Sequence, residues 1–483
     1  EFCHPFIKCN TIPALNLALA GNFNLVNTEE LFALVGIEPG VFQKQSDLAA
    51  MMEVVHHFLV KEDELHPEKL DIVNVLKKAA GLFDGGYHVG GLIGNGDSFV
   101  LRDEHGIRPS YYYVSDDVIV AASERAAIRT TFNVGENEVL ELMPGHALIV
   151  RADGSYQVEQ IIVPKERKAC SFERIYFSRG NDKKIYRERT ALGNHLSDHV
   201  LKAIDYDLKH TVFSFIPNTA EVAFYGLLKG MEDYLNKIKI QRITSWGKDY
   251  DEEKLAEMIN RRIRVEKIAN KDVKMRTFIT EDVSRKELVQ HVYDITYGSI
   301  RKHEDTVVVI DDSIVRGTTL RESIIRMLSR LEPKRIIIVS SAPQIRYPDC
   351  YGIDMSKMND FIAFQAAIQL IKEQKMDYLL QDLYNKCREL ERNNQLHTEN
   401  VVRGVYKPFS AEDISKKIAQ LITPQEITIP VSVIYQTIED LHESCPTNTG
   451  DWYFTGNYPT PGGNRVVNRA FINFMEGKNI RGY

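Results

Sequence analysis

The stretch Thr306-Val307-Val308-Val309-Ile310-Asp311-Asp312-Ser313-Ile314-Val315-Arg316-Gly317-Thr318-Thr319 decides the fold. Its first five residues are rich in β-branched side chains, which is typical of a buried parallel strand. Two carboxylates and a short turn follow, and we expect an amphipathic helix from about 320 to 331. A strand, a loop and a helix N-terminus in this order predict an anion site, because unpaired N–H groups and the helix dipole point at the loop.

The side chains of the loop refine this prediction. Thr318 and Thr319 add hydroxyl donors, and Gly317 allows a ligand to approach the backbone closely. Asp311 and Asp312 would repel a phosphate, so they need another partner, which is a set of sugar hydroxyls, a divalent metal, or both. They could instead be ordinary turn and N-cap residues. The Arg-Gly-Thr-Thr sequence behind them favours a binding role.

Composition places the chain among ordinary globular proteins. Its 483 residues allow two or three domains, and 43% hydrophobic with 26% charged residues is an average balance. A net charge of −7 argues against a general nucleic-acid binder. We recognise neither a secretory signal nor an apolar run of the ~18 residues that a membrane span needs. The six cysteines form no C-x-x-C pair, so they indicate neither a disulfide framework nor a zinc site, and we expect a cytoplasmic enzyme.

A second strand–loop–helix unit supports a ligand site at the edge of a sheet. Residues 211–216 predict a strand, 217–221 a loop, and the following residues to Lys229 a helix. The loop is either a place where a pyrophosphate meets backbone donors or an ordinary turn. The β-α alternation from 211 to 342 predicts a doubly wound parallel sheet with ligands at the carboxyl ends of its strands.

The first 165 residues have a different pattern. Short apolar runs alternate with Gly- and Asn-containing turns, as in the hairpin expected around Gly94-Asn95-Gly96-Asp97. Strands at such close spacing predict an antiparallel, β-rich α+β layer. The residues alone indicate no chemistry for this part.

Several motifs resemble one known family. The run 306–319 resembles the phosphoribosyl-pyrophosphate (PRPP) motif of type I phosphoribosyltransferases, and D-D-S-I-V-R-G-T-T is similar to that of the glutamine PRPP amidotransferases. Further similar motifs are R-D-x-x-G-I-R-P at 102–109, C-x-F-E at 170–173, Y-G-I-D-M at 351–355 and F-T-G-x-Y-P at 454–459. The resemblance implies a phosphoribosyltransferase domain at 166–430 with a doubly wound parallel sheet. It also implies a partial N-terminal-nucleophile (Ntn) hydrolase-like αββα domain at 1–165, and a tail at 431–483 that packs on the phosphoribosyltransferase domain.

The resemblance also implies roles in the binding of PRPP with Mg²⁺. Asp311 and Asp312 would hold the ribose hydroxyls, directly or through the metal, and count as catalytic together with Arg276 of a mobile flap. The 5′-phosphate would lie in the loop of Ser313, Ile314, Val315, Arg316, Gly317, Thr318 and Thr319. The pyrophosphate would face Pro217, Asn218 and Thr219. Ala220 stands where the family has a serine that helps to hold the metal.

The implied activity is that of an amidophosphoribosyltransferase, the glycosyltransferase that opens purine biosynthesis. Ammonia, released from glutamine in the complete enzyme, attacks the sugar C1 and displaces pyrophosphate. Purine nucleotides would inhibit the enzyme, which would be a homo-oligomer that binds neither nucleic acid nor membrane. The alternative is a PRPP-binding regulator with a relic glutaminase domain and no catalysis. Such regulators usually carry a DNA-binding domain, and no basic helix-turn-helix is evident here.

The expected glutamine site departs from the family pattern. The family's nucleophile is an N-terminal cysteine, whereas Cys3 follows Glu1 and Phe2 in a different motif. Gly21, Asn22 and Asp47 remain as a remnant of the glutamine site. Ala20 replaces the asparagine that stabilises the oxyanion, and loss of such a donor typically lowers kcat ~100- to 1000-fold. We expect that the start of this domain is omitted from the sequence and that the chain as given has no glutaminase activity.

Some relatives hold an iron–sulfur cluster on four cysteines. Cys170 stands at one ligand position, Cys350 is one residue away from a second, and the last two are lost in Gly450-Asp451-Trp452-Tyr453. We therefore predict no cluster and two plain buried thiols.

Overall fold

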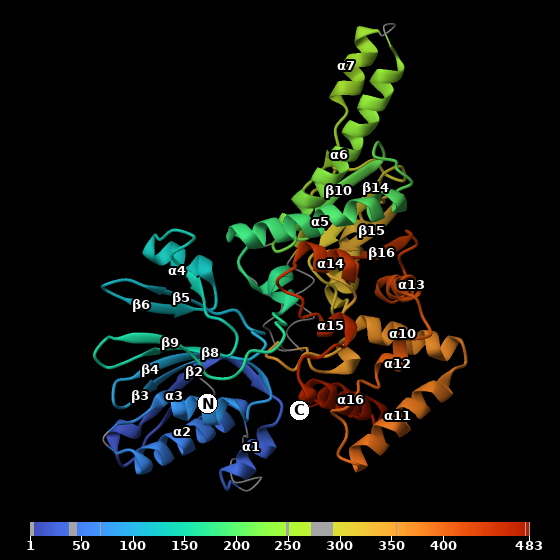
Figure 1. The fold of residues 1–483 in the computed structure, drawn as a ribbon. Helices are drawn as coiled ribbons and strands as arrows, with labels where there is room; N and C mark the ends of the chain where they lie inside the picture. The colour runs from blue at the N-terminus through green and yellow to red at the C-terminus, as the bar shows by residue number, and fades with distance from the viewer. Residues whose placement is uncertain are drawn as a thin grey trace.

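The computed structural model describes residues 4–37, 46–67, 69–247, 251–271, 293–353, 355–478 and 480–482. Cys3 and the expected flap residue Arg276 lie outside these ranges. Figure 1 shows the N-terminal strands and helices on one side of the molecule and the remaining chain on the other, with a helical arm projecting from the latter. No helix among the described residues combines the length and the apolar character needed to cross a bilayer.

The second half of the chain is built on a five-stranded sheet in which all neighbours are parallel, in the order β11-β10-β14-β15-β16. The strands are β10 (Thr211–Phe215), β11 (Arg264–Val265), β14 (Thr306–Asp311), β15 (Arg335–Ser340) and β16 (Val431–Tyr435). In chain order this is 2-1-3-4-5, a doubly wound arrangement whose strand order reverses between β10 and β14. The predicted sheet is confirmed, and β16, from the expected tail, is one of its two edge strands, opposite β11.

Helices cover both faces of this sheet because its strands are apolar on both sides. Val308 and Ile310 of β14 pack with α5 and α6, whereas Val307 and Val309 belong to the core on the other face. The covering helices are α5 (Lys183–Ala203) and α6 (Glu221–Ser245) on one side, and α9 (Ile325–Ser329), α10 (Ile362–Glu373) and α13 (Ala411–Ile422) on the other. A five-residue π-helical segment, Leu320–Ile324, leads from the loop after β14 into α9.

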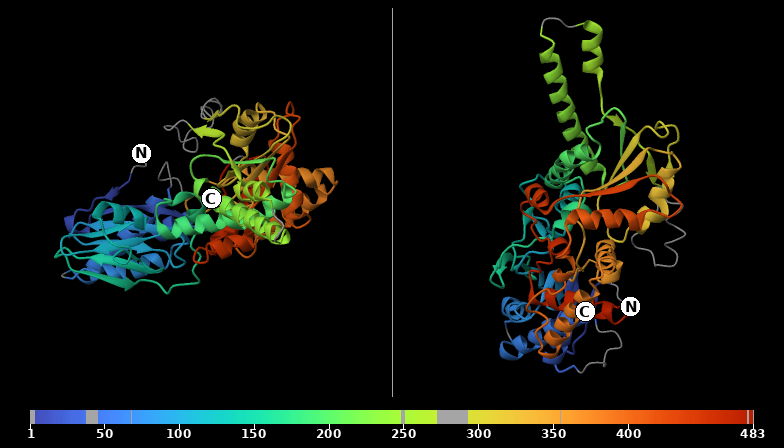
Figure 2. Two further views of the ribbon diagram at one scale, coloured as in Figure 1. Left: turned by 90° about the horizontal axis from the view of Figure 1, so that it is seen from above. Right: turned by 90° about the vertical axis from the view of Figure 1, so that its right-hand side faces the viewer.

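Helix α6 is longer than predicted. The predicted helix ends at Lys229, before Gly230, whereas α6 continues to Ser245 and forms the projecting arm with α7 (Glu252–Asn260) (Figures 1 and 2). Gly230 lies within the helix, where the absence of a side chain allows α5 to pack closely against α6. A Cβ at Gly230 would lie 2.5 Å from the Ser197 Cβ. The glycine therefore serves close helix–helix packing and is not a C-cap.

The first half of the chain forms four layers. A six-stranded antiparallel sheet has the order β1-β2-β3-β4-β8-β9, and a three-stranded sheet has the order β6-β5-β7. Helices α2 and α3 lie on the outer face of the first sheet and α4 beyond the second (Figure 1). The strands are β1 (Phe6–Lys8), β2 (Leu17–Leu25), β3 (Gly85–Ile93), β4 (Ser98–Arg102), β5 (Tyr111–Val114), β6 (Ile119–Ala122), β7 (Leu140–Glu141), β8 (His146–Val150) and β9 (Tyr156–Gln160). The helices are α1 (Thr28–Leu34), α2 (Asp47–Leu65), α3 (Ile72–Ala80) and α4 (Arg125–Phe132). This arrangement confirms the predicted αββα class.

The R-D-x-x-G-I-R-P motif joins the two halves. The fully buried guanidinium of Arg108 donates to the Tyr351 carbonyl from Nε at 2.9 Å and from Nη2 at 2.6 Å. Its Nη1 pairs with Glu173 at 3.0 Å. Asn24 of β2 adds a hydrogen bond of 2.8 Å to the Cys350 carbonyl. The motif thus fixes the 350–352 segment against the N-terminal layers.

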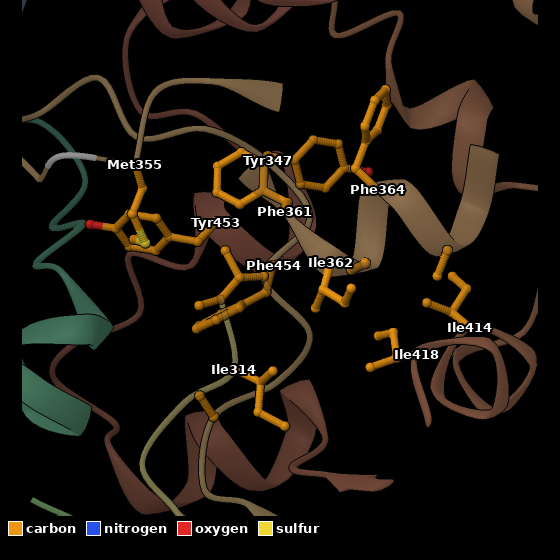
Figure 3. Close-up of a cluster of buried hydrophobic side chains, with 14 of the residues drawn as sticks. Ile314, Tyr347, Met355, Phe361, Ile362, Phe364, Ile414, Ile418, Tyr453 and Phe454 are labelled. Atoms are coloured by element: carbon orange, nitrogen blue, oxygen red, sulfur yellow. The ribbon is translucent and has the colours of Figure 1, made fainter. Parts of the chain in front are cut away.

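The C-terminal residues complete the core under the β14 loop. Figure 3 shows Ile314, Phe361, Ile362, Tyr453 and Phe454 in this buried cluster. The remaining helices are α11 (Asp377–Arg392), α12 (Arg403–Tyr406), α14 (Ile438–Ser444), α15 (Trp452–Thr455) and α16 (Pro461–Met475). Strands β12 (Ala269–Lys271) and β13 (Tyr293–Ile295) pair antiparallel beside the parallel sheet.

Candidate active site

A cavity opens where the strand order of the parallel sheet reverses. It is lined by Pro217–Thr219, which follow β10, and by Asp311–Leu320, which end and follow β14. Both loops leave the carboxyl ends of adjacent strands, which is the usual ligand position in doubly wound sheets. Every PRPP-binding residue predicted from the sequence lies in this lining, and Arg276 lies outside the described residues. Tyr176, Met355, Asp360 and Phe361 also line the cavity and were not assigned from the sequence.

The loop after β14 presents free backbone donors. Within the described part of the chain, none of the N–H groups of residues 313–318 donates to a backbone carbonyl. The loop is fixed by its carbonyls instead: the Ile362 N–H donates to the Val315 oxygen and the Arg321 N–H to the Gly317 oxygen, both at 2.9 Å. Gly317 has a φ of +70°, a conformation that favours glycine. The result is a rigid cradle of N–H groups suited to an anion.

The side chain of Ile314 does not face the ligand position. It is 3% exposed and packs into the hydrophobic cluster of Figure 3. Any contribution of Ile314 to binding comes from its N–H group, and its side chain anchors the cradle to the core.

The acidic pair is held in place by hydrogen bonds around it. The Asp311 Oδ1 accepts from the Asp312 N–H at 2.9 Å, and the Asp312 Oδ1 accepts from the Ser313 hydroxyl at 2.9 Å. Ser341 binds both backbone carbonyls, with its N–H on the Asp311 oxygen at 3.0 Å and its hydroxyl on the Asp312 oxygen at 3.1 Å. Both carboxylates are partly exposed toward the cavity. They offer the hard oxygen donors that Mg²⁺ prefers, so the donor set fits this ion.

Two charged side chains near the site were not predicted from the sequence. Asp360 pairs with Arg316 of the loop at 2.8 Å, although the two residues are 44 positions apart. Arg189 of α5 donates to the carbonyls of Arg174 and Ser178, each at 2.7 Å, and its charge interacts with Asp312. Burial lowers the pKa of the Arg189 guanidinium, and the Asp312 carboxylate opposes this shift.

Ala220, at the position where the family has a metal-binding serine, does not reach the cavity with a polar group. Ala220 is fully buried at the start of α6 and offers no side-chain oxygen. Carboxylate oxygens in the two loops therefore come from the acidic pair, and Asn218 and Thr219 add neutral side-chain oxygens to the cavity lining.

The expected glutamine-site residues are only partly brought together. The Gly21 N–H donates to the His4 Nδ1 at 3.2 Å, and His4 also interacts with Asp47. Burial raises the pKa of the Asp47 carboxyl, and hydrogen bonds from the Leu48 and Leu25 backbones oppose the rise. Asn22 follows Gly21 on β2 and projects to the opposite face. Its Oδ1 would lie 3.1 Å from a Cβ on Gly352, so it faces the junction between the halves.

The place of a possible cluster is filled by aromatic side chains. The Cys170 Sγ lies 3.1 Å from the Tyr453 hydroxyl, and Trp452 donates to Asp349 at 2.9 Å beside Cys350. Burial raises the pKa of the Cys170 thiol to about 12 and that of Cys350 well above its usual value. Two neutral thiols and a phenol do not match the four thiolates of a cluster.

The parallel sheet with this loop, joined to αββα layers, defines the fold as that of a type I phosphoribosyltransferase coupled to an Ntn-hydrolase-like domain. Comparisons with known proteins name one enzyme. The amidophosphoribosyltransferase of Pseudomonas aeruginosa is 27% identical over 358 residues, 72% of this chain and 64% of the relative. That of Saccharomyces cerevisiae is 24% identical and covers 92% of this chain and 73% of the relative.

Among solved structures, the glutamine PRPP amidotransferase of Bacillus subtilis complexed with ADP and GMP matches with a TM-score of 0.63 and 22% identity. The match covers 95% of this chain and 80% of that one. A scan against models of known families gives no match. The chain spans less than two thirds of the length of the Pseudomonas relative. These similarities confirm the family resemblance and the fold that the motifs predicted.

Proposed function

We propose that the protein is an amidophosphoribosyltransferase that transfers ammonia to PRPP and produces 5-phosphoribosylamine and pyrophosphate. One observation carries the proposal: the cavity at the strand-order reversal gathers the acidic pair, the N–H cradle and the Pro217–Thr219 loop. An anion cradle beside two carboxylates suits a ligand that carries both phosphates and sugar hydroxyls. The curated relatives bear the name of this activity.

In this proposal each group of residues has one task. The N–H groups of 313–318 and the hydroxyls of Thr318 and Thr319 bind the 5′-phosphate. Asp311 and Asp312 accept hydrogen bonds from the ribose hydroxyls and hold Mg²⁺. When bound, the ion neutralises charge on the departing pyrophosphate. Pro217–Thr219 face the pyrophosphate, and the N–H groups of Asn218 and Thr219, which donate to no backbone carbonyl in the described part of the chain, serve as donors.

The reaction exchanges one bond at the sugar C1. The bond from C1 to the pyrophosphate oxygen breaks and its electron pair leaves with pyrophosphate, while the ammonia nitrogen forms the new bond and then loses a proton. Positive charge develops at the sugar during this exchange, and the nearby carboxylates stabilise it. Arg189 holds the carbonyls of 174 and 178 and thereby positions the Tyr176 wall of the cavity. A flap that includes Arg276 would exclude water.

Further parts of the proposal follow the relatives. We assign residues 1–165 to the Ntn-type domain, which would supply ammonia from glutamine in the complete enzyme, 166–430 to the phosphoribosyltransferase domain and 431–483 to a tail packed on it. Purine nucleotides would inhibit the enzyme, in line with the Bacillus structure, which is a complex with ADP and GMP. A cytoplasmic homo-oligomer without an iron–sulfur cluster completes the proposal.

Pyrophosphate release from PRPP tests the proposal and separates it from a non-catalytic regulator. With ammonium chloride and Mg²⁺, we expect release that depends on both PRPP and ammonia. Asp312→Asn should lower kcat/KM at least ~10-fold, the equivalent of one lost charged contact. Asp116→Asn, a change of an exposed residue between β5 and β6, is the matched control. PRPP binding without any pyrophosphate release would favour the regulator and overturn the enzyme.

A further inference from the structure

Two histidines and two carboxylates meet where α5 packs on α14, away from the PRPP cavity. His195 and His199 stand four residues apart on α5, so they share one face of the helix. Asp440 and Glu443 stand three residues apart on α14 and face them. The His195 Nδ1 lies 3.3 Å from the Asp440 Oδ1, and the His199 Nε2 lies 3.7 Å from the Asp440 Oδ2. Asp440 thus lies between the two imidazoles.

The spacing of 3.3 Å between the His195 Nδ1 and the Asp440 Oδ1 matches the donor spacing around a small divalent cation, and the other donors would have to move closer by side-chain rotation. Zinc binds imidazole nitrogen and carboxylate oxygen at ~2.0–2.2 Å in a tetrahedron, which places neighbouring donors about 3.3–3.5 Å apart. One ligand atom from each of His195, Asp440 and Glu443 can be chosen so that all lie within 4.8 Å of one another. The Glu443 Oε1 is 4.0 Å from the His195 Nε2, and Glu443 is the most exposed member, so it has room to adjust.

The scaffold under the cluster is rigid. Gln436, just before α14, donates to the Leu192 carbonyl of α5 at 2.7 Å. The Thr437 hydroxyl caps α14 by accepting from the Asp440 N–H at 3.0 Å. Leu196 and Leu441 are fully buried beside the cluster. A site whose ligands stand on two fixed helices needs only side-chain rotation to close around an ion.

In the part of the chain that the structure describes, no lysine or arginine forms an ion pair with either carboxylate. Among the described residues, the ion pairs of Asp440 and Glu443 are formed with His195 and His199. Both histidines are partly exposed, so an ion can reach them from solvent.

We propose that His195, His199, Asp440 and Glu443 form a zinc-type site that links α5 to α14. Mixed imidazole and carboxylate ligands select a borderline transition metal such as Zn²⁺ over Mg²⁺, which prefers oxygen alone. The bound ion ties together two helices that pack against the parallel sheet. The site is independent of the proposed transferase reaction and involves none of its residues.

Zn²⁺ binding to the full chain tests the proposal. The protein carries Cys9→Ser, because the exposed Cys9 thiol could bind zinc, and the buffer holds excess Mg²⁺ to occupy Asp311 and Asp312. Competition with a chromophoric chelator should give one equivalent of bound Zn²⁺, and Co²⁺ should give the visible spectrum of a tetrahedral nitrogen–oxygen site. Zn²⁺ should also raise the Tm. A chain that binds no equivalent of either ion overturns the proposal.

Variants assign the site to these residues. His195→Gln and Asp440→Asn should each weaken Zn²⁺ binding at least tenfold, and His199→Gln should also weaken it. His210→Gln is the matched control, since His210 also pairs with an aspartate, Asp207, in a turn before β10. Equal affinity in His195→Gln and His210→Gln overturns the proposal. If the variants at His195, His199 and Asp440 fail to fold, Glu443→Gln decides, because the Glu443 side chain is 73% exposed. Zn²⁺ binding at least threefold weaker in this variant supports the site, and unchanged Zn²⁺ binding contradicts it.

Discussion

Replacing Gly317 by alanine should weaken PRPP binding far more than its effect on folding explains. Gly317 sits at the centre of the cradle with a φ of +70°, where a side chain costs roughly 1–2 kcal/mol. The new Cβ would also lie 2.8 Å from the Ile422 Cγ2. Carbon atoms normally approach to ~3.5 Å, so the loop must shift by about 0.7 Å. A shift of this size carries ~2.9 Å hydrogen bonds beyond their useful range.

The magnitude follows from the donors that move. Loss of even one hydrogen bond to a charged phosphate costs about 1.5–3 kcal/mol, so PRPP affinity should fall at least ~10-fold. Isothermal titration with PRPP and Mg²⁺ measures the affinity, and urea unfolding measures the stability of the same samples.

Gly298→Ala is the matched control for this experiment. Gly298 has a φ of +78°, and no heavy atom of the described residues lies within 4 Å of its Cβ position. It therefore has the same backbone cost without the clash and lies outside the cradle. Gly317→Ala should lose somewhat more stability than Gly298→Ala because of its clash with Ile422, and only Gly317→Ala should lose PRPP affinity. PRPP affinities of the two variants within twofold of each other would refute the assignment of this loop as the phosphate cradle.

Three further predictions concern the rest of the molecule. Burial and the nearby Arg102 charge lower the pKa of His88 to about 4, so as the pH falls below ~6.5 the imidazole is protonated in the unfolded state before it is protonated in the folded state. Protonation of His88 should therefore remove up to about 3 kcal/mol of folding stability by pH 4. The difference in the free energy of urea unfolding between the wild type and His88→Gln should change with pH by this amount. The raised pKa of Cys170 predicts that a thiol reagent at pH 8 labels Cys9 rapidly and Cys170 only on unfolding; rapid labelling of Cys170 in the folded chain would contradict its burial. A Cβ at Gly193 would lie 1.7 Å from the Ala223 oxygen of α6, so Gly193→Ala should destabilise the fold by at least about 1–3 kcal/mol, whereas an unchanged Tm would refute the close α5–α6 packing.

The sequence was most informative where the chemistry is local. Asp311 to Thr319 are consecutive, so their pattern predicted both the turn and the ligand site, and the structure places all of them at one cavity. The sheet could be predicted for a similar reason, since β14 and β15 are continuous apolar runs. Features formed within a single strand–loop–helix unit can therefore be predicted from the sequence.

Long-range partners could not be predicted in this way. Asp360 pairs with Arg316 across 44 residues, and Arg189 reaches the site from the middle of a helix. The helix was predicted only to Lys229, because the role of the next residue, Gly230, depends on its contact with Ser197 of another helix. The Asn22 side chain points toward the junction between the halves because that face of β2 contacts the 350–352 segment. Each of these features is set by tertiary packing, which periodicity and local motifs do not encode.

The transfer of nitrogen to the sugar carbon tests the central claim most directly. The chain is incubated with Mg²⁺, PRPP labelled with carbon-13 at C1 and ammonium labelled with nitrogen-15, and the products are followed by NMR together with pyrophosphate. The proposed activity predicts a carbon–nitrogen coupling at C1 and one pyrophosphate for each new bond. Pyrophosphate release with oxygen at C1, or PRPP that stays intact while bound, would contradict it.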